Sequence, residues 1–432
     1  MMDFELKAWL RAQHVDAGLY VADELIDAFI DEMTIGLNEA GAGTLPMIPA
    51  YIGTDHLIPH GQPVVVIDAG GTNLRIGLAE FDDAGTITLS SFNKQPMFGI
   101  KKELSGDVFF DGLAAAVAPL MGHTDVIGFC FSYPAEITPD CDGRLLHWTK
   151  EIKIPDVVGE CVGAGLLCAL AKLGYEGKRV IVLNDTVAAL LAGMAQGQNF
   201  GASNYVGYIL GTGTNTAYVE QNANILKVPN LSCEGSQVIN VESGGFNRFS
   251  RGPLDVKRDL ESGNPNKQQF EKMISGVYMG PLALELFKAA AGQGAFSEIG
   301  TVTIESLAEL STIHIDNLLA DEGRDTGILR TEVFTDGDRD LMRSIFEAVV
   351  DRAALLAAVN ISVAVIKGGG GFDPAAPVCI NIDGSTYYKT TGMSAKVQTG
   401  LTSILGARGI HYRCVHVDDA PVVGAAIAAL TR

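Results

Sequence analysis

The sequence predicts an α/β protein built from two related halves that face each other across a cleft. Two runs of mainly apolar, β-branched residues each lead into a glycine-rich turn, and helical periodicity follows in both parts of the chain. The triplet Gly-Thr-Asn stands at 71–73 and again at 213–215, a domain-sized distance further on. A glycine loop repeated at that separation is typical of two α/β halves that each contribute one turn.

The composition is that of an ordinary globular protein, and it argues against two classes of partner. The chain has 432 residues, which corresponds to about two or three domains. Its 51 acidic residues exceed its 31 basic ones, and the net charge of -20 repels nucleic acid and anionic lipid surfaces. The longest apolar stretches are shorter than the ~20 residues that cross a bilayer. We therefore expect neither nucleic acid nor a membrane as a partner.

The cysteines and the first residues predict a cytoplasmic protein. The seven cysteines are scattered and include no C-x-x-C pair, which argues against a disulfide framework and a zinc ribbon. The first residues are acidic where a secretory signal needs positive charge followed by an apolar stretch. His411, Cys414 and His416 fall on a predicted strand whose alternation sends side chains to opposite faces, so we expect no metal site there.

The first part of the chain predicts helices followed by a hairpin. Apolar spacing in residues 3–40 indicates two amphipathic helices, and the proline-rich segment 41–63 indicates an irregular connection. An apolar, β-branched run at 63–67, the turn 69–73 and an apolar run at 74–78 indicate a strand, a tight turn and a second strand. The first glycine turn is thus expected at the tip of a hairpin.

The rest of the chain repeats the hairpin and adds strands and helices. Residues 206–220 indicate a second strand, glycine turn and strand. The glycines at 368–371 are typical of a helix C-terminal stop. The other predicted elements are the strands 125–131 and 179–183 and the helices 186–194, 341–366 and 422–430.

The two glycine turns are candidates for binding phosphate. Neither a G-x-x-x-x-G-K-[ST] loop nor a G-x-G-x-x-G turn after a strand is present, which disfavours the two commonest nucleotide folds. Glycines let backbone N–H groups approach an anion closely, and Asp68 at a strand end can hold Mg²⁺ through water. One Gly-Gly-Thr turn alone is as well explained by a plain hairpin. Two such turns facing each other would hold a triphosphate.

Asp185 is the candidate general base. The triplet Asn184-Asp185-Thr186 lies where a predicted strand gives way to a helix, the edge at which α/β ligand sites form. Asp185 also fits a plain helix N-cap. A phosphotransferase with a hydroxyl acceptor needs one carboxylate to accept the proton, and few other acids lie at a strand end. Both interpretations stay open on local sequence.

Motifs along nearly the whole chain follow one another in an ordered series. They are VVVIDAGGTNLR (64–75), FSYP (131–134), WTK (148–150), NDT (184–186), GTGTN (211–215), NVE (240–242) and FEKMISG (270–276). In this order they resemble the eukaryote-type hexokinase and glucokinase family. The resemblance implies an actin-like ATPase (ribonuclease H-like) fold, with two α/β domains around a deep interdomain cleft. Residues 64–190 plus 419–432 would form the smaller domain, and residues 1–63 plus 191–418 the larger one.

The resemblance also implies an activity. It is the ATP- and Mg²⁺-dependent phosphorylation of a hexose, with glucose expected first, at the 6-hydroxyl, as the first step of glycolysis and with domain closure on sugar binding. Mannose, fructose and glucosamine stay open as substrates, and so does the oligomeric state.

Roles are implied for residues that match the family's positions. Asp185 is the implied general base, and Lys150 stabilises the transferring phosphoryl group. The implied sugar contacts are Ser132, Thr149, Lys150, Asn184, Asp185, Asn215, Glu242 and Glu271. The implied phosphate and metal contacts are Asp68, Gly70, Gly71, Thr72, Asn73 and Arg75 in the first loop and Gly211, Thr212, Gly213 and Thr214 in the second. The implied adenosine segment lies near Asp383, Gly384 and Ser385.

The chain departs from the family pattern at several places, and two rival functions stay open. Ser243 stands where the family has Trp after the sugar carboxylate, and Pro281 stands where it usually has Glu, which affects cleft packing and hexose preference. One rival is a non-catalytic hexose-sensing protein, and the other is a kinase of the same superfamily for another sugar. A sensor has no need of the set Asp185, Lys150, Asp68 and Thr212, all of which are present.

Overall fold

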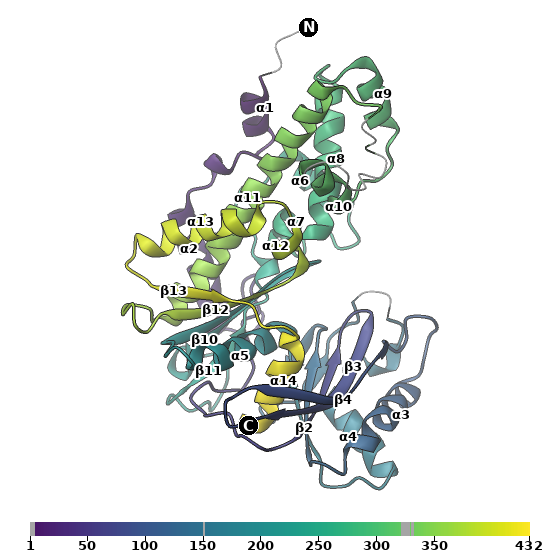
Figure 1. Ribbon diagram of the computed structural model, residues 1–432, viewed down its shortest axis with the longest axis vertical. Helices are drawn as coiled ribbons and strands as arrows, with labels where there is room; N and C mark the ends of the chain where they lie inside the picture. The colour runs from purple at the N-terminus through teal and green to yellow at the C-terminus, as the bar shows by residue number, and fades with distance from the viewer. Residues whose placement is uncertain (1–4, 150–151, 321–328, 330–331) are drawn as a thin grey trace.

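The computed structural model describes residues 5–149, 152–320, 329 and 332–432, and it contains two lobes, each built on its own sheet (Figure 1). One sheet has five strands in the order β4-β3-β2-β5-β8, and the other has six in the order β1-β11-β10-β9-β12-β13. A small hairpin, β6 (Ala135–Ile137) with β7 (Gly143–Leu145), completes the strands.

The five-stranded sheet is a three-layer α/β unit. All six residues of β2 (Val64–Ala69) are buried, as expected for a strand covered on both faces. Its side chains alternate between two cores: one holds α14 (Ala420–Thr431), and the other holds α3 (Gly106–Val117) and α4 (Val162–Lys172). The remaining strands are β3 (Asn73–Phe81) and β4 (Ile87–Pro96), which are antiparallel, and β5 (Val126–Phe131) and β8 (Arg179–Leu183), which are parallel to β2.

The six-stranded sheet is covered by α5 (Asp185–Gln198) on one face and by α11 (Asp336–Gly368) on the other. Its second glycine turn joins β9 to β10 in an antiparallel hairpin, as the sequence predicts. The strands are β1 (Ile48–Pro49), β9 (Asn204–Leu210), β10 (Thr214–Gln221), β11 (Ser236–Asn240), β12 (Val378–Asp383) and β13 (Tyr412–Val415).

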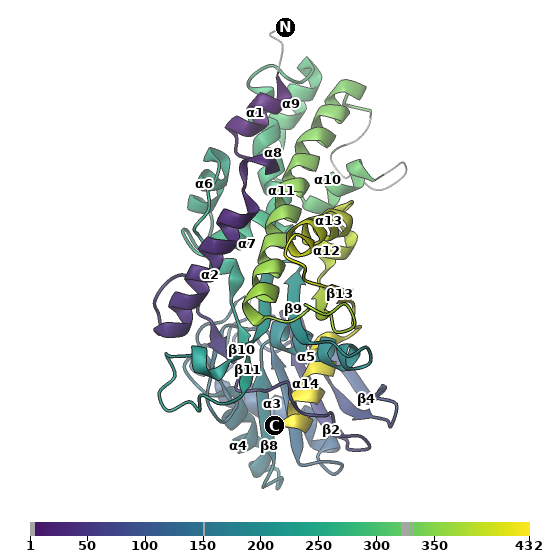
Figure 2. The ribbon, with the colours of Figure 1, turned by 90° about the vertical axis from the view of Figure 1, so that its left-hand side faces the viewer.

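A helical layer stands on the outer face of this sheet, where α11 packs against both α2 and α8 (Figure 2). Among the described residues, α11 is the one helix whose length and composition would suit a membrane span, but 83% of its most apolar window is buried inside the protein, as in a core helix. It ends at Gly369, whose φ of 75° is the stop predicted from the glycine run. The other helices are α1 (Leu6–Ala12), α2 (Ala22–Asn38), α6 (Pro253–Leu260), α7 (Gln269–Ile274), α8 (Gly276–Ala291), α9 (Glu298–Ser306), α10 (Thr312–Leu319), α12 (Ser385–Lys389) and α13 (Met393–Gly406).

Two helices packed against each other, α5 and α14, lie between the two sheets. Gly424 of α14 lies so close to α5 that a Cβ there would be 2.1 Å from the Ala188 carbonyl oxygen. On the far side of α14, a Cβ at Gly128 of β5 would be 2.0 Å from the Ala425 carbonyl oxygen. These contacts between backbones fix the start of α5 relative to α14 and the five-stranded sheet.

The domain bounds stay a prediction. The predicted boundary at residue 190 falls inside α5. The chain passes between the lobes three times: through residues 50–63 between β1 and β2, through α5, and after β13 through residues 416–419 before it forms α14. The predicted irregular connection 41–63 contains the two-residue strand β1.

Replacing Gly424 with alanine is expected to lower the free energy of unfolding by about 1–3 kcal/mol, because the new methyl group meets backbone that cannot move aside. Helix propensity alone predicts the opposite sign. Gly406→Ala is the control, since Gly406 is also helical and a Cβ there meets nothing within 4 Å. Urea titration of both variants checks this, and equal stability would contradict the close contact.

Candidate active site

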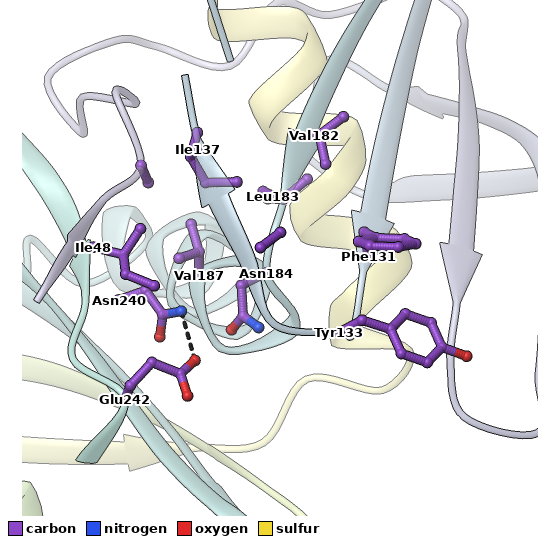
Figure 3. A pocket seen from close by; sticks show the side chains of 12 residues that line it. Ile48, Phe131, Tyr133, Ile137, Val182, Leu183, Asn184, Val187, Asn240 and Glu242 are labelled. Atoms are coloured by element: carbon purple, nitrogen blue, oxygen red, sulfur yellow. Dashed lines mark hydrogen bonds between the residues drawn. The ribbon is translucent and has the colours of Figure 1, made fainter. Parts of the chain in front are cut away.

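A pocket between the lobes gathers predicted sugar contacts from both sheets. Figure 3 shows Asn184, Asn240 and Glu242 around the same space, with apolar side chains from β5, β8 and α5 beside them. Asn184 comes from the end of the strand β8, and Glu242 follows β11 of the other sheet. The structure therefore brings together two predicted sugar residues that lie 58 positions apart in the sequence and follow strands of different sheets.

Asp185 is the first residue of α5 and directly follows Asn184, which lines the pocket. Asn184 caps the helix by accepting a hydrogen bond from the Thr186 N–H at 2.8 Å, which leaves Asp185 free of the capping role considered above. The Thr186 hydroxyl donates to Asp185 Oδ1 at 3.3 Å. A helix N-terminus is a favourable place for a carboxylate. The competing N-cap interpretation of Asp185 is therefore wrong, because the neighbouring Asn184 caps the helix.

Glu242 is held by two asparagine side chains. Asn240 Nδ2 and Asn215 Nδ2 donate to Glu242 Oε1 at 2.9 and 3.1 Å. Burial raises the pKa of Glu242, the bond from Asn240 opposes that rise, and the charge of Asp185 adds to it. Glu242 also has a φ of 57°, a left-handed conformation that costs energy in a residue with a side chain. Asn240 is a site residue that the sequence did not single out, although it lies inside one of the matching motifs.

Glu271, on α7, lies against the second glycine turn. Its Oε2 accepts a hydrogen bond from the Thr214 N–H at 3.0 Å, and a Cβ at Gly213 would be 2.4 Å from this oxygen. Burial raises the pKa of Glu271 to about 7, although the Thr214 bond opposes the rise, and the charge of Glu242 adds to it. A side chain at Gly213 would therefore displace the Glu271 carboxylate from the position that it has in the structure.

The first phosphate loop is fixed by its own backbone and by Tyr133. The Gly70 N–H donates to the Asn73 carbonyl at 3.0 Å, and the Tyr133 hydroxyl donates to the Gly70 carbonyl at 2.7 Å. Within the described part of the chain, the N–H groups of Gly71 and Thr72 have no hydrogen-bond partner. These two donors are therefore free to face an anion.

Asp68 lies buried at the end of β2 next to Arg75. Burial raises the pKa of Asp68, and the Arg75 guanidinium, whose Nε donates to Asp68 Oδ2 at 2.7 Å, opposes this rise. No group of three His, Cys, Asp or Glu side chains suited to a metal occurs among the described residues. A single carboxylate oxygen with water and phosphate oxygens is a donor set that Mg²⁺ accepts, so Asp68 fits the predicted metal role.

The second glycine turn borders a large pocket near the predicted adenosine segment. Thr212, Gly276 and Ser385 line a pocket of about 1350 Å³, a value that includes space open to solvent. Gly384 has a φ of 116°, and a Cβ there would be 2.2 Å from the Leu210 carbonyl oxygen, so only glycine fits. The structure thus joins the segment 383–385 to the second turn.

Some predicted contacts have other partners in the structure. The Thr214 hydroxyl donates to the Ile209 carbonyl at 2.9 Å, and its N–H donates to Glu271 at 3.0 Å, so both donors of Thr214 have partners in the protein. The Gly211 N–H likewise donates to the Gly213 carbonyl at 2.9 Å. Both polar groups of the Asn215 side chain bond to protein, with Oδ1 accepting from the Thr216 N–H at 2.7 Å. The phosphate and sugar roles of these residues stay predictions.

Ser132 and Thr149 are partly buried at the edge of the five-stranded lobe, and their sugar roles also stay predictions. Trp148, beside Thr149, packs edge-on against Tyr133 with ring centres 4.9 Å apart. Lys150 lies outside the described residues. Ser243, at the position of the missing Trp, has a buried hydroxyl that contacts the Thr216 hydroxyl and accepts from Asn360 Nδ2, both at 3.0 Å.

Comparison with known proteins agrees with this architecture. Two family models, each described as hexokinase, match residues 13–195 and 205–431. Hexokinase-7 of Oryza sativa subsp. japonica is 32% identical, covering 94% of this chain and 92% of that protein, and Hexokinase-2 of Solanum tuberosum is 31% identical, covering 94% and 87%. The hexokinase of Schistosoma mansoni in complex with glucose aligns with a TM-score of 0.78 at 25% identity over 99% of each chain, which confirms the predicted fold class. The chain belongs to the hexokinase family.

Proposed function

We propose that this protein transfers the γ-phosphoryl group of ATP to the 6-hydroxyl of a hexose, with glucose as the first candidate, as the first step of glycolysis in the cytoplasm. The observation that carries the proposal is the position of Asp185, at the N-terminus of α5 and beside the pocket that holds Asn184 and Glu242. Membership of the hexokinase family and the likeness to a glucose-bound hexokinase support hexose phosphorylation.

The chemistry follows from the side chains. A sugar presents neighbouring hydroxyl groups, and the carboxylates of Glu242 and Glu271 accept hydrogen bonds from them in charge-assisted bonds. Asp185 accepts the proton of the 6-hydroxyl as that oxygen attacks the γ-phosphorus. The free N–H groups of the first loop donate to the transferring phosphoryl group. Mg²⁺, held through Asp68, would neutralise charge on the phosphates.

Domain closure is part of the proposal, because the groups come from both sheets. Water is also a hydroxyl nucleophile, and an enzyme that assembled its site without sugar would hydrolyse ATP. The five-stranded sheet supplies Asp68, the six-stranded sheet supplies Glu242, and Asp185 lies at the junction. Binding of a hexose between them would draw the lobes together and exclude water.

The test is an ADP-release assay over glucose, mannose, fructose and glucosamine with the Asp185→Asn variant. Loss of a general base is expected to lower kcat by roughly 10²–10⁴ and to leave sugar affinity nearly unchanged. Asp107→Asn is the control, since Asp107 lies in the first turn of another helix with its side chain 90% exposed.

Near-normal turnover of Asp185→Asn would remove Asp185 from its role. Hexose binding by the unaltered protein without any ADP release would favour the non-catalytic sensor instead.

Hexose affinity is expected to rise with pH through about 7, because the carboxylate form of Glu271 accepts from sugar hydroxyls and its pKa lies near that value. Below the pKa, each pH unit is expected to weaken this contribution by up to about tenfold. Binding near pH 7 should also release a proton, which calorimetry in buffers of different ionisation enthalpy detects. Glu271→Gln should bind more weakly and lose the pH dependence; an unchanged affinity and slope would contradict the assignment.

A further inference from the structure

An ion pair joins the first phosphate loop to the segment that crosses between the lobes. Arg75 lies opposite Asp68 in the register of β3 and β2, and its Nε bonds to the Asp68 carboxylate. Its Nη1 donates to Asp419 Oδ1 at 2.5 Å. Asp419 precedes α14, at the end of the crossing segment 416–419. Arg75 therefore connects Asp68 to Asp419, which lies 344 positions beyond Arg75 in the chain.

The other end of the crossing segment is attached to the strand that carries the predicted adenosine residues. The Val417 N–H donates to Asn381 Oδ1 at 3.2 Å, and His416 Nδ1 lies 3.2 Å from the Ile382 carbonyl oxygen. Both partners belong to β12, which ends at Asp383, directly before Gly384. The segment thus contacts the phosphate side and the adenosine side of the predicted nucleotide site.

Asp419 is oriented toward Arg75 and not toward its own helix. Its side chain makes no capping hydrogen bond to α14, and its φ is 52°. The left-handed conformation is tolerated by Asp but costs energy, and it persists where the surroundings hold it. Within the residues that the structure describes, the remaining Arg75 nitrogen, Nη2, has no partner. That nitrogen is available to a phosphate oxygen.

We propose that Asp419 is a positioning residue for phosphoryl transfer: it holds Arg75, and through Arg75 the carboxylate of Asp68, in place relative to the adenosine segment. The inference rests on the proposed kinase function and deepens its nucleotide side. Asp419 touches neither sugar nor nucleotide in this scheme. Its effect reaches the reaction through the direction of the Arg75 guanidinium and the charge beside Asp68.

The experiment compares Asp419→Asn with Asp418→Asn. Asp418 is the matched control because it is the neighbouring acid, its side chain is 98% exposed, and it faces His416 at 3.4 Å. Asp419→Asn is expected to lower kcat/KM for MgATP by roughly two- to fivefold, the range for a partly exposed ion pair, while the hexose dissociation constant stays the same. Asp418→Asn is expected to match the unaltered protein in both, and Asp419→Glu to recover part of the loss.

A double-mutant cycle with Arg75→Lys separates positioning from a general loss of structure. Lysine cannot make the two directed bonds of the guanidinium, so the effects of Arg75→Lys and Asp419→Asn should be less than additive in kcat/KM for MgATP. Additive effects, an Asp419→Asn variant that matches Asp418→Asn, or a parallel loss of hexose affinity and thermal stability would overturn the proposal. Absence of ADP release by the unaltered protein would instead overturn the proposed function.

If Asp419→Asn fails to fold, the Asp419→Glu and Arg75→Lys variants test the proposal instead. A Glu variant that folds and loses part of its kcat/KM for MgATP, less than Arg75→Lys and with the same hexose affinity, supports the link through Arg75. A Glu variant that folds and shows normal kcat/KM for MgATP contradicts it. A folded Arg75→Lys variant with normal MgATP kinetics contradicts it.

Discussion

The contact between α5 and α14 is the constraint on which the site depends. Each helix is the inner layer of one lobe, and at Gly424 their backbones touch without a side chain between them. Gly207 of β9 likewise lies against the backbone of α5, where a Cβ would be 2.6 Å from the Leu190 nitrogen. Because small residues on both sides set the distance, the N-terminus of α5 has a fixed place between the sheets. Asp185 occupies that place.

A second constraint is electrostatic, since the site concentrates carboxylates in an acidic protein. Burial raises the pKa of Asp68, Glu242 and Glu271; the charge of Asp185 adds to the rise at Asp68 and Glu242, and the charge of Glu242 adds to it at Glu271. Asparagine amides, a backbone N–H and one guanidinium offset part of that rise. The same arrangement explains why free N–H groups in the glycine turns matter: a triphosphate that enters this field needs positive dipoles close to its oxygens.

Local patterns predicted much of the fold. Both glycine hairpins, the strands 125–131 and 179–183, the long helix and the final helix are confirmed, because apolar periodicity and glycine placement act over neighbouring residues. The short strand β1 lies in a segment that prolines mark as irregular, and only its pairing with β11 makes it a strand. Such pairings depend on residues far apart in the chain.

The site was predicted unevenly for the same reason. Asn184, Asp185 and Glu242 stand at strand ends or beside them, and local sequence or a motif indicates them. Asn240 and Asp419 act through partners, and no local pattern states that Asn240 faces Glu242 or that Asp419 reaches Arg75. Likewise the hydroxyl of Thr214 is bonded inside its hairpin and its N–H to Glu271, which the motif alone does not reveal.

The polar group beneath Glu242 shows how the chain differs from its family pattern without losing the carboxylate. Ser243 replaces the expected Trp, and its hydroxyl joins Thr216 and Asn360 in a buried network, with the Thr216 hydroxyl donating to Asn360 Oδ1 at 2.9 Å. Asn360 is a polar residue within the apolar stretch of α11, and its bonds with Ser243 and Thr216 explain why a polar side chain stands there. A buried polar group is costly unless it is paired, so the three side chains hold one another in place. The turn that carries Glu242 is therefore anchored to the long helix by hydrogen bonds, where a bulky aromatic ring would anchor it by packing.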